Sequence, residues 1–432
     1  DIAVIDATTL GVSYVERLMN ICMALGVNPA SGRVALVGTD ATNEVRFEPN
    51  LKGVFLRVNV ALVDLAGAVA PSIVDLNPHL DYHSATVPQA ERDLSIGDPR
   101  GIAWSADGSR GYVAGLGSNN VIVVDPTGGR VGAPIEVGEG PTGLAISGTT
   151  LYALNRFEGS ISVIDTVAGA ETARVALHDA TPVAIKRGRK HLYGTHGGSG
   201  LGHIACGSCH VDARMDRLAW DLGDPGGEMK ALTGQNLGMG LFGLDTNFTP
   251  WHPMKGPMTT QTLQDIIGKE PLHWRGDRAG LEMFDEGFRL LQGDDGPLGA
   301  VEMQEFKDFL ASIHFPPNPY RDVDNSLPTS VDLTGFVSFG RFSPPGTQLP
   351  DGNPVAGLDR YVNDAMDGPL RCATCPDGCC SLTSPTTWVL RSTASTICWG
   401  RSRPEVRMRC MRRESYTDLL APKPAANACA QT

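Results

Sequence analysis

The stretch PRGIAWSADGSRGYVAGLGSNNVIVVD, residues 99–125, alternates β-rich runs with the turn signals Asp107-Gly108 and Asn119-Asn120. It returns at residues 141–165 as PTGLAISGTTLYALNRFEGSISVID. A period of about 40 residues with several strands per copy is typical of β-propeller blades. One such unit cannot bury both faces of its own sheet, so each copy needs neighbours. The two copies therefore predict a propeller.

Looser copies extend the repeat to both sides. Downstream, TPVAIKRGRKHLYG places Pro182 at the next expected position, and upstream MALGVNPASGRVALVGTDATNEV occupies residues 23–45. The opening DIAVIDATTL matches the end of a copy, so the propeller, which we assign to residues 1–198, is expected to be incomplete as given. Residues 46–96 are interpreted as an insertion in one blade. A rigid scaffold is the expected role of the propeller, and substrate binding is the alternative.

The units resemble the YVTN family of bacterial propeller repeats, whose pattern reads G-I-A-x-S-x-D-G-x-x-x-Y-V-x-x-x-x-S-N-x-V-x-V-I-D. The match is good across residues 99–165 and looser elsewhere. Four or five such units can be counted along the chain.

The net charge of the chain indicates which kinds of partner are not expected. The chain of 432 residues has a formal net charge of −12, and an acidic surface repels nucleic acid and anionic lipid. No apolar run reaches the roughly 18 residues that a spanning helix needs. The chain opens on Asp1 rather than Met, so we expect a processed or truncated product, and the compartment stays open on this point.

The pattern changes after Tyr193. A glycine-rich linker, THGGSGLGH, leads into three stretches with helical signals, GHIACGSCHVDARM, TTQTLQDIIG and GAVEMQEFKDFLASIHF. The last is expected to stop at Pro316-Pro317. We therefore expect a mainly α domain over residues 199–325.

CGSCH, residues 206–210, is the attachment signature of c-type haem. Residues three apart share a helix face, so both thiols can form thioethers with one porphyrin, and the next residue supplies the iron ligand. Cys206 and Cys209 are the predicted thioether residues and His210 the predicted proximal ligand. The alternatives are a thioredoxin-like dithiol, which lacks a βαβ context, a zinc site that includes His203, and a chance match.

The stretch WHPMKGPMTTQTL, residues 251–263, offers His252, Met254 and Met258 as distal iron ligands. Methionine and histidine are the usual distal residues. We favour Met258, with Met254 and then His273 as alternatives, and each methionine can equally be core filler.

Other residues are candidates for the haem surroundings. The aromatic ones are Trp220, Trp251 and Trp274, which can be pocket walls or ordinary core. Two arginines of HWRGDR (273–278) can pair with haem propionates or with surface carboxylates.

The second half resembles the dihaem cytochrome c peroxidase and MauG superfamily over residues 200–375. The resemblance rests on CGSCH, on TTQTLQDIIGKEPLHWRGDRAGLEMF (259–284), and on a second Cys-x-x-Cys pair at Cys372 and Cys375. It implies two small helical cytochrome domains with one haem each, the second beginning within residues 326–375, and peroxidase-type chemistry.

The second motif departs from that family. Pro376 stands where the motif needs histidine, and no histidine follows His314. From residue 371 onward the chain holds seven cysteines and eight arginines without periodicity. The simplest interpretation is that residues 376–432 are out of frame and that a second haem is doubtful. The alternative is a metal-binding tail that uses Cys372, Cys375, Cys379 and Cys380.

Three functions follow from these motifs. The first is a c-type cytochrome that transfers electrons on a propeller scaffold, with a redox protein or a small electron donor or acceptor as partner. The second is a peroxidase-type oxidoreductase, with Glu282, Asp285 and Glu286 as acid–base candidates. The third is a propeller-based binding protein with an accessory haem. Thioether attachment takes place outside the bacterial cytoplasm, so we expect a periplasmic or otherwise exported protein.

Overall fold

The computed structural model describes residues 1–42, 47–67, 69–229, 252, 254, 256–270, 272–274, 278–340, 343–367 and 370–371. Within them, three four-stranded antiparallel sheets dominate the first half of the chain. The strands of the first are β3 (Ile21–Val27), β4 (Val34–Ala41), β5 (Leu56–Val63) and β6 (Ser72–Asp75); of the second, β7 (Pro99–Trp104), β8 (Gly111–Gly115), β9 (Asn120–Val124) and β10 (Arg130–Glu136); and of the third, β11 (Pro141–Ser147), β12 (Thr150–Asn155), β13 (Ser160–Asp165) and β14 (Ala170–Ala176). Each is a meander in chain order, which is consistent with propeller blades.

The predicted turns lie where the sequence puts them. Gly108 has φ 68° in the turn between β7 and β8, and Asn119 has φ 54° between β8 and β9. Glycine and asparagine tolerate this left-handed backbone better than other residues. The signals read from residues 99–125 are thereby confirmed.

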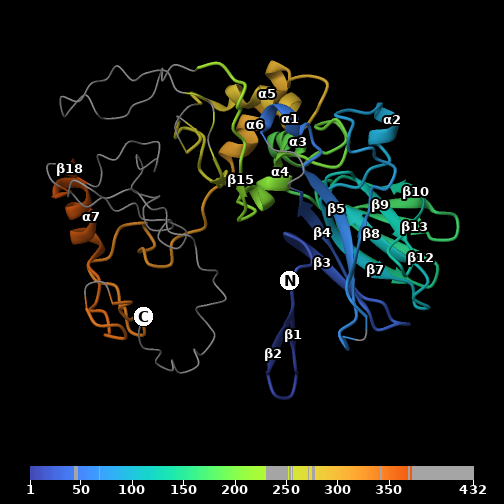
Figure 1. The fold of residues 1–432 in the computed structure, drawn as a ribbon, viewed down its shortest axis with the longest axis horizontal. Helices are drawn as coiled ribbons and strands as arrows, with labels where there is room; N and C mark the ends of the chain where they lie inside the picture. The colour runs from blue at the N-terminus through green and yellow to red at the C-terminus, as the bar shows by residue number, and fades with distance from the viewer. Residues whose placement is uncertain are drawn as a thin grey trace, which may run out of the picture.

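The three sheets lie next to one another (Figure 1), and β7 contacts both the first sheet, through β3 and β4, and the third, through β11. In β12, Leu151 and Ala153 are fully buried while Tyr152 and Leu154 are more than a third exposed. A strand with one buried face has this period of two. Two apolar cores result. The one between the first two sheets includes Val37, Val58, Val60, Trp104, Val113 and Ile122, and the one between the second and third includes Tyr112, Val121, Ile135, Leu151 and Ile164.

A separate hairpin opens the chain. Strands β1 (Ile2–Ile5) and β2 (Val12–Val15) pair with each other and pack partly on the first sheet through Ile2 and Val15. Its far end stands away from the sheets (Figure 1), and Leu10 there is 72% exposed.

Two expectations about the repeat are wrong. Residues 46–96 are not simply an insertion, because they supply β5 and β6, the third and fourth strands of the first sheet. Residues 183–193 are not a blade but the helix α3 (Val183–Tyr193). That helix packs against α6 (Ala300–Ala311), so tertiary contacts outweigh the repeat pattern at this position.

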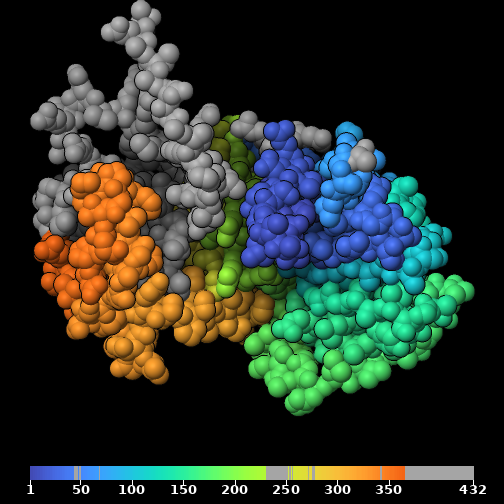
Figure 2. Space-filling model, turned by 90° about the horizontal axis from the view of Figure 1, so that it is seen from below, coloured from blue at the N-terminus to red at the C-terminus, as the bar shows by residue number. Residues whose placement is uncertain are grey.

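The helical part is built around α3 and α6. The remaining short helices are α1 (Glu48–Leu51), α2 (Gln89–Arg92), α4 (Cys206–Cys209), α5 (Asp285–Leu290), α7 (Pro354–Asn363) and the 3-10 turns Val211–Ala213 and Leu281–Phe284. Short strand pairs join β15 (Ala219–Trp220) to β16 (Met258–Thr259) and β17 (Ala365–Asp367) to β18 (Leu370–Arg371). A third apolar cluster includes Leu192, Phe288, Met303, Phe306, Phe309 and Leu310. In Figure 2 the described residues after α6, drawn in orange, lie on the side of the molecule opposite the blades.

The expected helix at TTQTLQDIIG does not form. After β16, residues 260–268 are turns and irregular backbone. Leu263 N donates to the Ala213 carbonyl, and Asp265 N donates to the Ile313 carbonyl. These amides serve neighbouring segments rather than a helix of their own, and they fix the segment beside CGSCH. None of the helices in the described ranges is long and apolar enough to cross a membrane.

Candidate functional site

CGSCH forms one helical turn at the junction of the sheets and the helical part. The Ala205 amide donates to Ser208 Oγ at 3.0 Å, which starts the turn, and the His210 amide donates to the Cys206 carbonyl at 2.9 Å, which completes it. Cys206 and Cys209 lie three positions apart in α4 and form no disulfide. The expected helical turn at the motif is therefore present.

The two thiols border different apolar clusters. Cys206 packs with the cluster that contains Leu192 and Phe288, and Cys209 packs with the cluster that contains Phe55 and Ile204. Between them, Gly207 lies against the ring of Tyr193, with its missing Cβ position 2.9 Å from Cδ1. Each thiol thus has apolar surroundings, which suits attachment to a large apolar ring.

Burial makes both thiols poor thiolates. It raises the pKa of Cys206 to about 11 and holds the pKa of Cys209 well above its usual range, with the Asp216 charge adding to the effect at Cys209. Redox dithiols need a lowered thiol pKa, whereas a bound metal ion itself deprotonates its cysteine ligands. The His203 ring donates from Nε2 to the Leu56 carbonyl at 3.0 Å, and the described residues contain no group of three or more metal-ligating side chains. The raised pKa values weigh against a reactive dithiol, and the zinc alternative stays open.

His210 is oriented by the backbone of the segment after β16. Its Nδ1 lies 2.8 Å from the Gln261 carbonyl oxygen and donates to it. The ring also forms a hydrogen bond with the backbone of Arg214. A histidine that binds a metal typically donates its other ring N–H in this way, because the bond fixes the tautomer and the ring orientation.

The surroundings of His210 favour its neutral form. Burial lowers the pKa of His210, and the charge of His273 lowers it further, while the Gln261 and Arg214 backbone and the Asp216 carboxylate oppose the shift. The neutral ring is the form that ligates iron. The donor set fits a c-type haem at Cys206, Cys209 and His210.

The three distal candidates lie in different settings. Met258 is half-buried in β16, paired with Trp220 and three residues before Gln261. Met254 is 39% exposed. The ring of His273 contacts Phe284 edge-on at 4.6 Å, and its charge acts on His210. The distal ligand stays a prediction.

The aromatic and arginine candidates also lie in different settings. Trp220 donates from Nε1 to Asp216 at 2.7 Å, and Trp274 donates to the Thr259 carbonyl at 2.6 Å. Both therefore frame the segment that holds His210. Arg278 lies over the Phe284 ring, and its Nε is buried without a hydrogen-bond partner in the described ranges, as an anion-holding arginine would be. Trp251 and Arg275 lie outside the described residues.

The acid–base candidates have structural partners. Glu282 pairs with Lys307 at 2.6 Å, and this hydrogen bond lowers the pKa of Glu282. Asp285 accepts from the Leu298 amide at 2.8 Å. Glu286 is mostly exposed and pairs loosely with Arg289. The second motif, with Cys372 and Cys375, lies outside the described residues.

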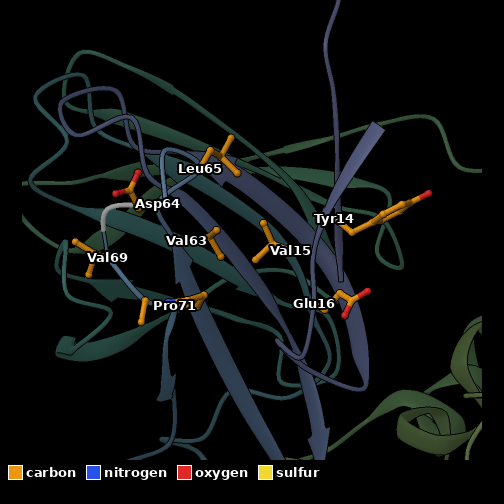
Figure 3. Close-up of a pocket in the computed structure, with 10 residues that line it drawn as sticks. Tyr14, Val15, Glu16, Val63, Asp64, Leu65, Val69 and Pro71 are labelled. Atoms are coloured by element: carbon orange, nitrogen blue, oxygen red, sulfur yellow. The ribbon is translucent and has the colours of Figure 1, made fainter. Parts of the chain in front are cut away.

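A cavity of about 470 Å³ lies away from this site, between the opening hairpin and the first sheet. Figure 3 shows Val15 and Val63 at its centre, with Glu16 and Asp64 at opposite sides. Its described lining holds neither histidine nor cysteine, and its carboxylates are apart. We assign no chemistry to it.

Sequence reasoning missed two contributors to the site. The Gln261 group that matters is a backbone carbonyl, which any residue offers, so no sequence signal marks it. Arg100 and Asp212 form an ion pair at 2.9 Å between the second sheet and the turn after His210. Their separation in sequence hides that contact.

Comparison with known proteins gives similarity to solved structures alone. No protein-family model and no curated protein matches the chain. Hydrazine synthase of Kuenenia stuttgartiensis is similar over 38% of this chain and 50% of its own, at 18% identity and a TM-score of 0.32. A streptogramin B lyase is similar over 40% of this chain and 47% of its own (14% identity, TM-score 0.27), and the WD40 repeats of RRP9 over 38% and 41% (11% identity, TM-score 0.26). The chain thus spans half or less of each of these structures, and similarity at this level says nothing of what it binds.

Proposed function

We propose that the chain is a c-type cytochrome that transfers electrons, with its haem module carried on a scaffold of propeller-type blades. Cys206 and Cys209 would hold the haem through thioethers, and His210 would ligate its iron from Nε2. The observation that carries the proposal is the 2.8 Å bond from His210 Nδ1 to the Gln261 carbonyl. It gives the ring the tautomer and the fixed orientation that a proximal ligand needs.

The surroundings of the motif support the same function. A bound haem supplies an iron centre that gains and loses one electron. The apolar clusters at Cys206 and Cys209 would cover it, and burial of that kind is one of the terms that set a haem potential. Arg278 would be a candidate to hold a propionate, because its Nε is buried without a hydrogen-bond partner in the described residues.

Electron transfer is favoured over peroxidase chemistry by the state of the acidic residues. A general acid needs a raised pKa near the working pH, whereas the ion pair with Lys307 keeps Glu282 ionised. Asp285 is engaged by the Leu298 amide. A redox partner protein or a small electron donor or acceptor, and an exported location, belong to this proposal.

The test uses the full chain, exported from a host with haem c maturation. We expect a low-spin haem that is reduced and reoxidised reversibly and shows no peroxide turnover. A high-spin ferric haem with peroxide turnover would instead support the peroxidase alternative and contradict the proposal.

A further inference from the structure

A side chain of the second sheet forms an ion pair with the turn that follows His210. Arg100, in β7, donates from Nε to Asp98 Oδ1 at 2.6 Å and from Nη2 to Asp98 Oδ2 at 3.2 Å. Its third contact runs from Nη1 to Asp212 Oδ1 at 2.9 Å. Asp212 comes two residues after His210, so one guanidinium joins a blade strand to the haem-binding turn.

The turn needs such a contact because its backbone is strained. Asp212 has φ 53° and Ala213 has φ 57°, both in the left-handed region that residues with a side chain disfavour. The amide of Ala213 donates to the His210 carbonyl and that of Arg214 to the Val211 carbonyl, each at 2.9 Å. The Ala213 carbonyl in turn accepts from the Leu263 amide, two residues beyond Gln261. The strained pair therefore sits between His210 and the segment that orients it.

The exposure of Asp98, Arg100 and Asp212 shows which side of this ion-pair network is held rigidly. The side chains of Asp98 and Arg100 are 3% and 16% exposed, so this bidentate pair is rigid and belongs to the blade. The side chain of Asp212 is 67% exposed. Its carboxylate is thus held in place by Arg100 rather than by packing. A second tie lies nearby, where the Thr195 amide donates to the Gly117 carbonyl at 2.9 Å.

We propose that Arg100 is a positioning residue, through which the blade holds the left-handed turn at Asp212 and so sets the orientation of the His210 imidazole. The inference rests on the proposed haem site for its last step. Its first step, the clamp on the turn, concerns the chain with or without haem. On this view the blades are part of the haem site rather than a passive support.

The test changes Asp212 rather than Arg100, because loss of Arg100 would leave Asp98 buried and unpaired and would destabilise the blade itself. Asp212→Asn removes the charge and keeps a residue that tolerates the left-handed region. Asp212→Ala removes both. Asp332→Asn is the matched control, since Asp332 is an exposed aspartate that accepts from the Thr334 amide far from this turn.

The first readout is amide hydrogen exchange at Ala213 and Arg214 in the haem-free chain. We expect exchange about threefold faster in Asp212→Asn, the effect of losing a half-exposed ion pair. We expect about tenfold in Asp212→Ala, which adds backbone strain. Asp332→Asn should match the parent. Unchanged exchange in both Asp212 variants would overturn the clamp.

The second readout is the electron paramagnetic resonance spectrum of the ferric haem protein, whose g-values report the orientation of the axial imidazole. We expect the largest g-value to shift in both Asp212 variants at unchanged haem content. Faster exchange with identical g-values would overturn the positioning step. A parent chain without covalent haem would overturn the proposed function instead, and the exchange result would still decide the clamp.

Discussion

Gly188 in α3 offers a sharp test of the helix pair that supports CGSCH. A Cβ at this position would overlap the Glu305 carbonyl oxygen and Phe309 Cβ, both of α6. The Glu305 contact is with backbone and cannot be relieved by a rotamer change. Gly188→Ala should therefore push the two helices apart.

The magnitude follows from two opposing effects. Alanine in a helix interior gains about 1 kcal/mol over glycine. Overpacking against a well-packed neighbour costs about 1–3 kcal/mol, and contact with backbone places this case near the upper end. We expect Gly188→Ala to lower the free energy of unfolding by about 2 kcal/mol.

Gly287→Ala is the matched control. Gly287 is also helical, in α5, and nothing lies within 4 Å of its added Cβ. This variant should be stabilised by up to about 1 kcal/mol. Urea unfolding of the two variants and the parent, compared at equal slopes, measures the difference. A Gly188→Ala midpoint equal to or above that of Gly287→Ala would refute the close packing of α3 on α6.

Three further predictions concern the site. Burial lowers the pKa of His203 from 6.5 to about 4, so on acidification the unfolded chain binds a proton at this histidine before the folded chain does. The contribution of His203 to the free energy of unfolding should be complete above pH 6.5 and should fall by roughly 3 kcal/mol as the pH drops toward 4. Unfolding measured across this pH range should show that His203→Gln abolishes the loss. In the haem-free chain at pH 8, iodoacetamide should modify Cys206 and Cys209 far more slowly when the chain is folded than when it is unfolded in urea. The rate at Cys206 in the folded chain should rise toward pH 11. Equal rates in the folded and unfolded chain would contradict the thiol burial. Met258→Ala should convert the low-spin haem to high-spin while Met254→Ala and His273→Ala leave it low-spin; the reverse result for His273 would move the distal ligand there.

The blades could be predicted because their signals are local. Turn residues such as Gly108 and Asn119 and the alternation in β12 depend on neighbours a few residues away. The stretch after Pro182 carries the repeat spacing too, yet it is a helix, because Gly188 lets α6 approach closely. No property of residues 182–193 alone announces that partner.

The candidate site also has a part that the sequence predicts and a part that it does not. CGSCH could be predicted because the spacing of Cys206, Cys209 and His210 itself reflects the chemistry. The Gln261 carbonyl and the Arg100 clamp could not be predicted, since both depend on how distant segments meet. The helix predicted at 259–268 does not form for a related reason. Amides of this segment donate to the carbonyls of Ala213 and Ile313, which are distant in sequence, and no local pattern indicates these contacts.

The central claim is that CGSCH carries a covalent haem, and the most direct measurement is the intact mass of the denatured full chain after export with haem c maturation. The account predicts one haem retained per chain and none in the Cys206→Ser, Cys209→Ser double variant. A parent chain that loses all haem on denaturation, or a double variant that keeps it, would contradict the assignment.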